Sequence, residues 1–600
     1  MAPQSSGSVD NGIAWCGSQE THHLVGHNRE VPILFRPITH GNTFHIERTA
    51  GEKNAKNQFY SEIPAIAKII TGISACPEYF IAESPLLTKM GATGHDRPSP
   101  GMGGVPAGRI RKAPIRNGRR PPGRMRDVEH FYRVAVKEHM MQEESRSQWG
   151  SSFGFMMAMA GSAIGLGNLW KFPYMAGKNG GGIFLLVYII FVVIVGVPLI
   201  LGEMAIGRHT RLEPVSAFER LDKRFKFVGV LGVLSGVLIP CYYVVIGGWV
   251  LAYIFRFIIY ISEGMPADIG GSFTNFISNP WEPLVWQTLF LIGSAYIIYR
   301  GVEKGIEKFS KIMMPILFVL LLVMIVRSLT LPGAWEGVVF LLKPDLSKLT
   351  RGGVMDAMGQ MFWSMSLGMG IIITYGSYMR KKNNMVTGAI VIPFLDTLAA
   401  VMAGLCILPA VFAFGIEPTQ GATLTFITLP QVFARMPMGT LFGIIFFVLL
   451  MLAAITSNVS LMEVGVGYLI DRHKMRRHRA TILISAFTLV FSIPCSLSMG
   501  IISSDAVLGF LAVGPLAEVK LFSLNFFDLI DYLAQNIFMI VAGLFTCIFV
   551  GYSWGVDNAI KEITNDGQVP FRGASWLRFM VRYVSPVFMV LVLLRALSIL

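Results

Sequence analysis

Charge and cysteine are scarce in this sequence. Only 15% of the 600 residues are charged, against 53% that are hydrophobic, and the mean hydropathy is +0.55. Soluble domains carry about 25% charged residues, so this shortage excludes most soluble classes of protein. The six cysteines have neither metal-ligand nor disulfide spacing, and we interpret them as small core residues.

The sequence also lacks the motifs of enzymes. It contains no nucleophile paired with a base, no ligand spacing for a transition metal and no phosphate-binding loop. These absences predict that the protein is not an enzyme and that ATP does not supply its energy.

Long apolar stretches, in contrast, are abundant. A membrane-spanning helix needs about 20 mostly apolar residues, and such stretches recur from Ser151 to the last residue. Eleven of them are found, at 153–174, 181–206, 227–262, 283–300, 307–327, 353–379, 384–415, 438–471, 479–500, 527–554 and 574–599. Several contain glycine or proline, which is typical of helices interrupted where they line a cavity. The predicted fold class is an all-α polytopic membrane protein with about 11 transmembrane helices.

Positive charge follows every second span. Clusters of lysine and arginine lie at 208–226, 300–311, 380–382 and 472–479, whereas the intervening loops are mixed or acidic. The positive-inside rule therefore predicts a cytoplasmic N-terminus and, with eleven spans, a C-terminus outside. The net charge of +14 then reflects orientation in a lipid bilayer and does not indicate a nucleic-acid partner.

Residues 1–140 differ from the rest of the chain. They contain no apolar span, and the run from Gly108 to Arg126 is rich in Arg, Pro and Gly, which should not fold compactly. Because Met140 and Met141 directly precede the polar approach to the first span, we interpret 1–140 as a disordered or spurious extension and 141–600 as the transmembrane domain. A regulatory tail or an RNA-binding arm ranks lower, since the basic run has no interleaved aromatic residues.

The first and sixth spans share small and polar residues at their centres. These segments are Ala160–Gly167 and Ser364–Gly370. They lie five helices apart, and an odd offset inverts one copy in the membrane relative to the other, as in transporters whose sites form at discontinuous helices. We therefore predict a five-plus-five inverted repeat (153–327 and 353–554) with broken first and sixth helices, and one extra helix at 574–599.

Four motifs carry a resemblance to a known family. They are AMAGSAIGLGNLWKFPY from Ala158, IPCYYV from Ile239, GQMFWSMSLGMG from Gly359 and AAITSNVS from Ala453. In this order they closely resemble the neurotransmitter:sodium symporters, which have the leucine-transporter-like fold, and particularly the bacterial amino-acid-transporting branch, over residues 146–600. The resemblance implies a symporter of the bacterial inner (plasma) membrane that imports an amino acid with sodium by alternating access.

Two alternatives remain open at this point. A proton-coupled carrier of the same fold would titrate Asp396 instead of binding sodium, and a membrane sensor would keep the fold but not transport. The sequence also leaves open the identity of the amino acid, the sodium stoichiometry, any proton counter-transport, and whether the protein is a monomer or a homodimer.

The resemblance implies two sodium sites built from oxygen ligands, which hard cations prefer. The first comprises Ala163, Asn168, Ser364 and Asp396, together with the carboxylate of the substrate; the second comprises Gly161, Ile164, Ala453, Thr456 and Ser457. Residues 453, 456 and 457 share one helix face. Taken alone, the two hydroxyls could instead bond to the preceding helical turn. Because Asp396 supplies a fixed negative charge, no chloride requirement is predicted.

The resemblance also places the substrate between the first, third, sixth and eighth helices. The implied binding residues are Ser162, Ala163, Leu166, Gly167, Ile239, Tyr243, Trp363, Ser364, Ser366, Met369 and Leu461. Gly165 stands where monoamine carriers of the family have an aspartate, so the substrate should bring its own carboxylate. A flexible Met369 favours a large apolar or aromatic side chain, although ordinary packing explains that methionine equally well.

Paired charges at the two ends of the cavity are candidate gates. We predict an outer pair of Lys171 with Asp531, beneath an aromatic lid of Tyr243 and Trp363. Lysine lacks the bidentate fork of the arginine that is usual in the family.

The inner gate is predicted to be Arg146 with Asp471, with Trp149 as an apolar plug. Each of the two charges would more often be an ordinary interfacial charge if considered alone. Gly305 and Pro315 resemble a motif at which bacterial relatives unwind the fifth helix.

Overall fold

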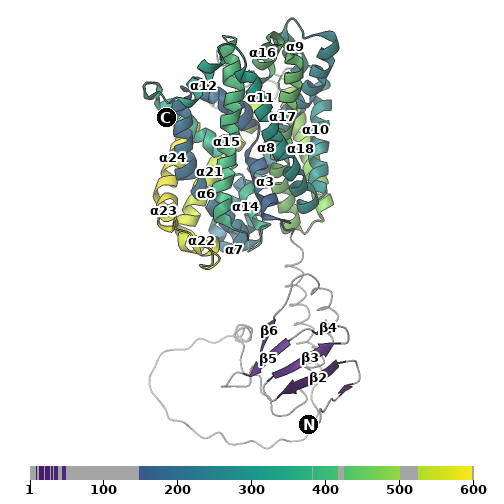
Figure 1. Ribbon diagram of the computed structural model, residues 1–600, viewed down its shortest axis with the longest axis vertical. Helices are drawn as coiled ribbons and strands as arrows, with labels where there is room; N and C mark the ends of the chain where they lie inside the picture. The colour runs from purple at the N-terminus through teal and green to yellow at the C-terminus, as the bar shows by residue number, and fades with distance from the viewer. Residues whose placement is uncertain are drawn as a thin grey trace, which may run out of the picture. The chain divides into compact units, whose positions relative to one another are not determined.

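The computed structural model describes strands within residues 8–48 and, continuously, residues 147–381, 383–415, 424–499 and 524–597. The chain divides into two compact units, Met1–Arg119 and Arg120–Leu600 (Figure 1). Arg146 lies outside the described residues, so its predicted role at the inner gate has no structural counterpart here.

Six strands are described in the first unit. Antiparallel β1 (Ser8–Val9), β2 (Ile13–Ser18), β3 (Thr21–Gly26) and β4 (Arg29–Glu30) form one sheet in that order, and β5 (Ile33–Pro37) pairs with β6 (Phe44–Arg48). Ser18 pairs with Thr21 at the end of the β2–β3 ladder. The weak periodicity of this region did not indicate strands, and the interpretation of 1–140 as a disordered or spurious extension stays a prediction.

In the described part of the second unit every regular element is a helix. The first half consists of α3 (Ser152–Ala163), η1 (Gly167–Lys171), α4 (Phe172–Lys178), α5 (Gly182–Phe191), η2 (Val192–Gly196), α6 (Val197–Thr210), α7 (Pro214–Leu221), η3 (Lys223–Phe225), α8 (Lys226–Glu263), α9 (Ile269–Ile277), α10 (Glu282–Tyr299), η4 (Val302–Glu307), α11 (Lys308–Leu329), α12 (Ala334–Leu342) and η5 (Leu346–Lys348).

The second half begins with the broken sixth helix. It consists of α13 (Arg351–Ser364), α14 (Ile371–Ser377), α15 (Met385–Ala413), η6 (Leu424–Thr428), α16 (Leu429–Arg435), α17 (Gly439–His473), α18 (Arg477–Leu497), α20 (Phe526–Asp531), η9 (Tyr532–Phe538), α21 (Met539–Ile548), η10 (Phe549–Ser553), α22 (Val556–Ile563), α23 (Ala574–Phe579), η11 (Met580–Val584) and α24 (Ser585–Ala596).

The predicted spans coincide with these helices. Among the described residues, eight continuous helices are long and apolar enough to cross a membrane, and the pair Ser152–Ala163 and Gly167–Lys178, bent by 53°, makes a ninth. The two remaining predicted spans, 283–300 and 353–379, coincide with α10 and with the α13–α14 pair. Side chains such as Phe394, which is 62% exposed, cover the outside of the bundle as hydrocarbon contact requires.

Both predicted helix breaks are present, and their backbones explain the small residues there. At the first, α3 stops where Ile164 turns to an extended conformation. At the second, Ser366, Gly368 and Gly370 all have positive φ, which glycine adopts at little cost. A Cβ at Gly368 would also lie 2.3 Å from the carbonyl oxygen of Met539. The breaks leave backbone amides and carbonyls without partners in their own helices, so these groups can bond to side chains at the centre of the bundle.

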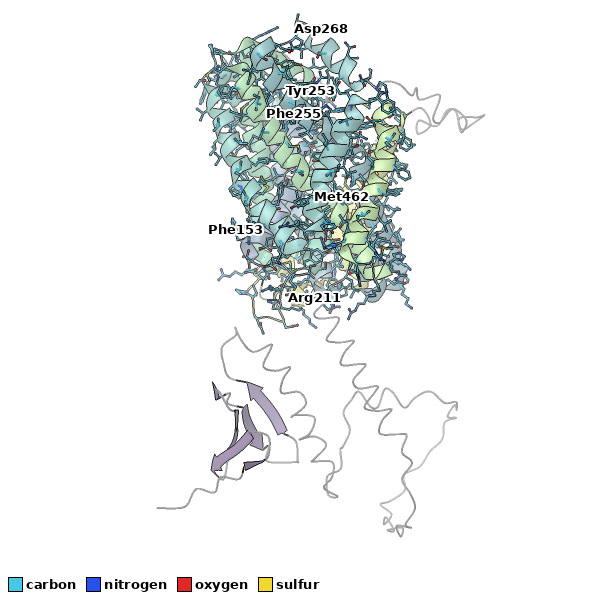
Figure 2. The ribbon with its side chains drawn as sticks, turned by 90° about the vertical axis from the view of Figure 1, so that its right-hand side faces the viewer. Phe153, Arg211, Tyr253, Phe255, Asp268 and Met462 are labelled. Atoms are coloured by element: carbon cyan, nitrogen blue, oxygen red, sulfur yellow. The ribbon has the colours of Figure 1, made fainter. Side chains whose placement is uncertain are left out.

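The basic clusters gather at one end of the bundle, where α6 and α17 finish and α8 and α18 begin; we call this the basic end. Arg211 marks it in Figure 2, and Asp268 marks the opposite end. In Figure 1, α7 and α22 lie at the basic end, whereas α9, α12 and α16 lie at the opposite end.

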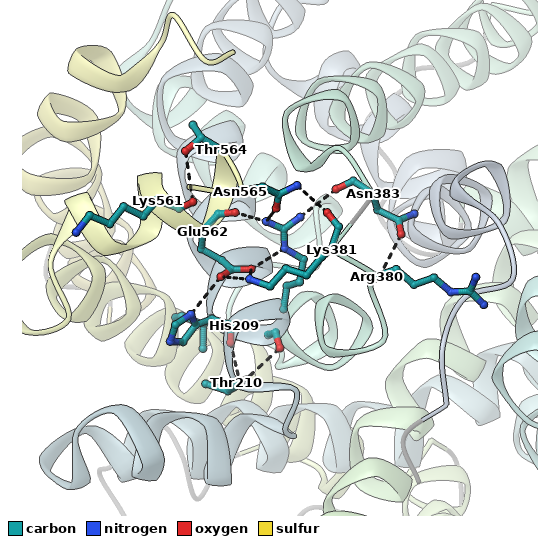
Figure 3. Close-up of polar contacts among 12 residues, drawn as sticks. His209, Thr210, Arg380, Lys381, Asn383, Lys561, Glu562, Thr564 and Asn565 are labelled. Carbon is teal, nitrogen blue, oxygen red and sulfur yellow. Dashed lines mark hydrogen bonds and ion pairs between the residues drawn. The ribbon is translucent and has the colours of Figure 1, made fainter. Parts of the chain in front are cut away.

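A polar network around a buried ion pair lies at the basic end (Figure 3). Arg208 Nε donates to Glu562 Oε1 at 2.7 Å, and their side chains are 0% and 4% exposed. Lys381 Nζ lies 2.7 Å and His209 Nδ1 3.1 Å from Glu562 Oε2. Burial acts to raise the pKa of Glu562, but hydrogen bonds from His209, Lys381 and Arg208 outweigh it and hold that pKa at about 2. The network joins α6, the α14–α15 connection and α22.

Candidate functional site

A buried cavity of about 30 Å³ lies between the two helix breaks. Its lining comes from α3 and its break, α8, the α13–α14 break and α17. The lining residues are Ser162, Ala163, Gly165, Leu166, Gly167, Asn168, Ile239, Tyr243, Trp363, Ser364, Ser366, Met369, Ile371, Ser457 and Leu461. Every residue predicted for substrate binding is among them, together with Gly165, Ile371 and two predicted sodium ligands.

Asp396, on α15, is the centre of a hydrogen-bond cluster beside this cavity. Asn168 Nδ2 donates to its Oδ1 at 2.8 Å, and Ser364 Oγ lies 2.9 and 3.0 Å from the two carboxylate oxygens. Asn168 also donates to Ser364 Oγ at 3.0 Å. The structure therefore brings together the three side chains predicted for the first sodium site, while Ala163 lines the cavity next to them.

Tyr188 was missed by the sequence reasoning. Its hydroxyl donates to Asp396 Oδ2 at 2.8 Å, and the side chain is fully buried in α5. No cationic side chain contacts Asp396 among the described residues. A signal for Tyr188 did exist, because a tyrosine inside the apolar run GIFLLVYIIF needs a partner for its hydroxyl once it is buried.

A second cluster joins α17 to the end of α3. Ser457 Oγ lies 3.3 Å from the carbonyl oxygen of Gly161, 3.2 Å from that of Ser162 and 3.5 Å from that of Ile164. Thr456 Oγ1 lies 3.0 Å from the carbonyl oxygens of both Leu452 and Ala453, which is bonding to the preceding turn of its own helix. All five groups predicted for the second sodium site therefore lie at this junction.

Each break makes a hydrogen bond to another helix at the cavity. The amide of Leu166 donates to the Tyr243 hydroxyl at 3.3 Å, and Ser366 Oγ donates to the carbonyl of Ser162 at 3.3 Å. Gly165 lies close to two side chains. A Cβ at this position would lie 2.7 Å from Ser457 Oγ and 3.2 Å from the Tyr243 hydroxyl. An aspartate at this position would not fit the observed packing.

Gln360 is a second residue that the sequence reasoning missed. Its Nε2 donates to the carbonyl of Gly167 at 3.0 Å, which ties α13 to the first break. The apolar side of the cavity is formed by Ile239, Met369 and Leu461, as predicted, and by Ile371, which begins α14 and was also missed. Isoleucine in an apolar run gives no signal that would single it out.

Lys171 and Asp531, the predicted outer pair, attract each other electrostatically but make no ion-pair contact in the described structure. Lys171 Nζ lies 5.1 Å from the ring centroid of Trp363, over its face, and Asp531 accepts a hydrogen bond from Gln535. Lysine above an indole face is a cation–π contact. Trp363 and Tyr243, the predicted lid, both line the cavity.

At the basic end, Trp149, which was predicted to be an apolar plug, is buried, with an exposed fraction of 1%. Its Nε1 donates to the carbonyl of Tyr375 at 3.0 Å, and its ring lies 5.1 Å from that of Tyr375 and 6.1 Å from that of Tyr378. Asp471 accepts from the amide of Glu213 at 2.8 Å. Asp471 also lines a cavity of about 550 Å³ at the basic end.

Comparison with known proteins identifies relatives of the chain. The family model described as the Sodium:neurotransmitter symporter family matches residues 146–261 and 277–600. A sodium-dependent transporter of Bacillus subtilis is 37% identical over 466 residues, which are 77% of this chain and 100% of that protein. A sodium-dependent transporter of Haemophilus influenzae is 36% identical over 463 residues, 75% of this chain and 98% of that protein.

A solved structure supports the same relationship. The crystal structure of MhsT in complex with L-phenylalanine is 41% identical in sequence, covers 75% of this chain and 100% of MhsT, and superposes with a TM-score of 0.67. The match confirms the predicted fold. With the family model matching most of the chain, these findings show that the chain belongs to the sodium:neurotransmitter symporter family and is a multi-pass, sodium-dependent membrane transporter, not an enzyme.

Proposed function

We propose that this transporter imports an amino acid with a large apolar or aromatic side chain, coupled to sodium and by alternating access. The observation that carries the proposal is the cluster at Asp396. A buried carboxylate without a cationic partner is costly in a membrane, and it is surrounded here by amide, hydroxyl and carbonyl groups rather than by lysine or arginine. Sodium bound to this donor set would supply the missing charge.

The hydrogen bonds at Asp396 favour sodium over a proton as the coupling ion. Asn168, Ser364 and Tyr188 all donate to its two carboxylate oxygens. An ionised carboxylate only accepts hydrogen bonds, whereas a protonated one would have to donate its own. The described residues also hold no cluster of three or more His, Cys, Asp or Glu side chains for a transition metal, and the oxygen-rich junction at Ser457 suits a second sodium ion.

The substrate orientation follows from which groups line each side of the cavity. The amides of Leu166 and Gly167 and the hydroxyl of Tyr243 suit a carboxylate, while Ser364 and Ser366 offer oxygen atoms to an ammonium group. The side chain of the substrate would then lie against Ile239, Met369, Ile371 and Leu461. That MhsT is described in complex with L-phenylalanine supports an aromatic substrate.

The cavity has to widen for such a ligand. At about 30 Å³ it offers space for one or two water molecules only. Met369 has three rotatable bonds and can leave the cavity by changing rotamer. An opening of the lid above it would give the remaining space, so the observed conformation is a closed one.

We further propose that the basic end faces the cytoplasm of a bacterial cell, in the inner membrane, because lysine and arginine concentrate there. We also propose that two sodium ions and no chloride take part in transport, and that the protein is a monomer or a homodimer.

A thermal-shift screen tests substrate and coupling ion together. The purified protein is melted with each of the twenty amino acids in sodium, and again in choline at the same pH, because a ligand that binds only the folded state raises the melting temperature. We expect phenylalanine, tryptophan or leucine to stabilise the protein in sodium but not in choline. A shift that survives in choline and follows pH would support the proton-coupled carrier instead. A ligand that binds but is not taken up by proteoliposomes would indicate a sensor.

A further inference from the structure

The cavity of about 550 Å³ at the basic end has an excess of positive charge in its lining. Its walls come from the end of α6, from α7, from the end of α17 and from the start of α18. The charged lining residues are Arg211, Arg220, Lys474, Arg477 and Asp471. Four cationic side chains therefore share the lining with one carboxylate, in a space as large as many small-molecule sites.

Only Arg477 among these cations has a carboxylate partner in the described part of the chain. It forms an ion pair with Glu463, which is buried in α17. Among the described residues, no ion pair joins a carboxylate to Arg211, Arg220 or Lys474. Three cations at this cavity therefore lack a counter-charge of their own.

The acidic groups near the cavity are engaged elsewhere. Glu219 pairs with Lys226 and Arg472. Glu213 caps the first turn of α7 with its side chain. The Asp471 carboxylate, which is the acidic group in the lining, accepts a hydrogen bond from the Glu213 amide at 2.8 Å. In the described structure these groups do not balance the three cations.

The backbone at two of the three cations is one that glycine adopts more readily. Arg211 ends α6 with a φ of 56°, and Lys474 ends α17 with a φ of 54°. Glycine is the usual residue at such a helix end, because a side chain strains the left-handed backbone. A cation in the last helical turn also complements the helix dipole, but Arg208 and Arg472 already supply that charge. The strained positions therefore point to a use for the two side chains in the cavity.

We propose that this cavity binds a phosphate group through Arg211, Arg220 and Lys474. The guanidinium groups offer paired N–H donors that match two oxygen atoms of a phosphate, and the lysine adds a point charge. Three cations against the Asp471 carboxylate leave an excess of two positive charges, which suits a phosphate that is close to doubly ionised. The bound group would join the loop after α6 and α7 to the end of α17. The inference is independent of the substrate and of the coupling ion.

Melting curves of the full-length protein in an uncharged detergent test the proposal. Inorganic phosphate is titrated against chloride at constant ionic strength, because a ligand that binds only the folded state raises the melting temperature. We expect a shift that saturates, whereas the general stabilisation of proteins by excluded phosphate does not saturate.

A second arm of the experiment distinguishes the source of the phosphate group. Phosphatidylglycerol is added to the detergent, with phosphatidylcholine as the reference. A saturating shift with inorganic phosphate identifies a soluble anion as a ligand, and a shift with phosphatidylglycerol alone identifies the headgroup of an anionic lipid. The proposal is overturned if neither probe produces a saturating shift beyond its reference.

Two variants separate a built site from general attraction to a basic surface. Arg211→Gly removes a cation and relieves the positive φ, so folding should survive. In Arg211→Gly and in Lys474→Gln, the concentration of the effective probe at half-saturation should rise roughly ten- to a hundredfold, the range for losing a hydrogen bond to a charged group. Arg476→Gln is the matched control, since Arg476 is exposed at the same end but lies outside the lining. An unchanged half-saturation in either variant, or an equal rise in the control, would contradict the assignment.

Discussion

Replacing Trp149 by alanine should shift the protein from the closed conformation towards one that is open at the basic end. The indole is 1% exposed, contacts two tyrosine rings and donates to the Tyr375 carbonyl. Truncating a buried tryptophan to alanine costs about 3 to 5 kcal/mol. If an open conformation exposes residue 149, the closed conformation alone bears this cost.

The expected shift in the conformational equilibrium follows because the substitution destabilises the closed conformation and not the open one. Each tenfold change in an equilibrium constant corresponds to about 1.4 kcal/mol. The equilibrium between the closed and open conformations should therefore move by roughly two to three and a half orders of magnitude. Repacking of the surrounding rings would reduce this shift. The apparent affinity for sodium and substrate then falls in proportion to the lost closed fraction. Trp149→Phe keeps a ring but loses the hydrogen bond and should have a smaller effect, of about 1 kcal/mol.

Binding and hydrogen exchange measure the two consequences separately. We expect Trp149→Ala to weaken sodium-dependent ligand binding and to accelerate exchange at the start of α3. Trp335→Ala is the matched control, because this tryptophan is 71% exposed, at the start of α12, away from the basic end. A lower melting temperature with unchanged affinity and unchanged exchange would refute the reasoning, since the tryptophan would then stabilise both conformations equally.

Three further predictions concern the ion sites and the basic end. Thr456→Val combined with Ser457→Ala should abolish sodium-dependent uptake without preventing folding, as tracer uptake and gel filtration would show; uptake at the original rate would exclude the second site. Uptake should continue when gluconate replaces chloride, and Asp396→Asn should cripple it, whereas a chloride requirement would contradict the fixed-charge argument. Glu562→Gln should lower stability by about 3 to 5 kcal/mol, since it leaves a buried arginine without its counter-charge, while Asp557→Asn, in the exposed pair of the same helix, should change the melting temperature little. The pKa of Glu562 near 2 lies below its ordinary value of about 4.3, so its stabilisation should be complete above about pH 4.3 and should fade as the pH falls towards 2, which melting curves can follow.

Features that depend on local sequence could be predicted. The two helix breaks follow from glycine and small residues, because left-handed backbone at Gly368 and Gly370 strongly favours glycine. The hydroxyls of Thr456 and Ser457 share a face with Ala453 through the helical repeat alone. The cavity lining then followed from the family resemblance at matching motif positions.

Features that depend on contacts between distant residues could not be predicted. Tyr188 and Asp396 are 208 residues apart, and Glu307 and Gly150 are 157 apart. No periodic pattern in the sequence links the two residues of either pair. The predicted outer pair shows a different limit. Lys171 lies over the Trp363 ring and attracts Asp531 without an ion-pair contact, and charge alone does not specify this arrangement.

Different contacts hold the two ends of α3, and only those at the C-terminal end involve a proposed sodium site. At its C-terminal end, one Ser457 hydroxyl lies 3.2 to 3.5 Å from three carbonyl oxygens. A single hydroxyl hydrogen cannot satisfy three acceptors, whereas one cation can be coordinated by several oxygens at once. At its N-terminal end, Glu307 accepts hydrogen bonds from the amides of Gly150 and Ser151 and from the Ser151 hydroxyl at 2.6 to 3.1 Å, and it carries its own charge. If sodium binds at this junction as proposed, attachment of the C-terminal end should weaken when the ion leaves, whereas the contacts of Glu307 at the N-terminal end do not depend on the ion. Sodium loss alone should therefore leave α3 held at its start.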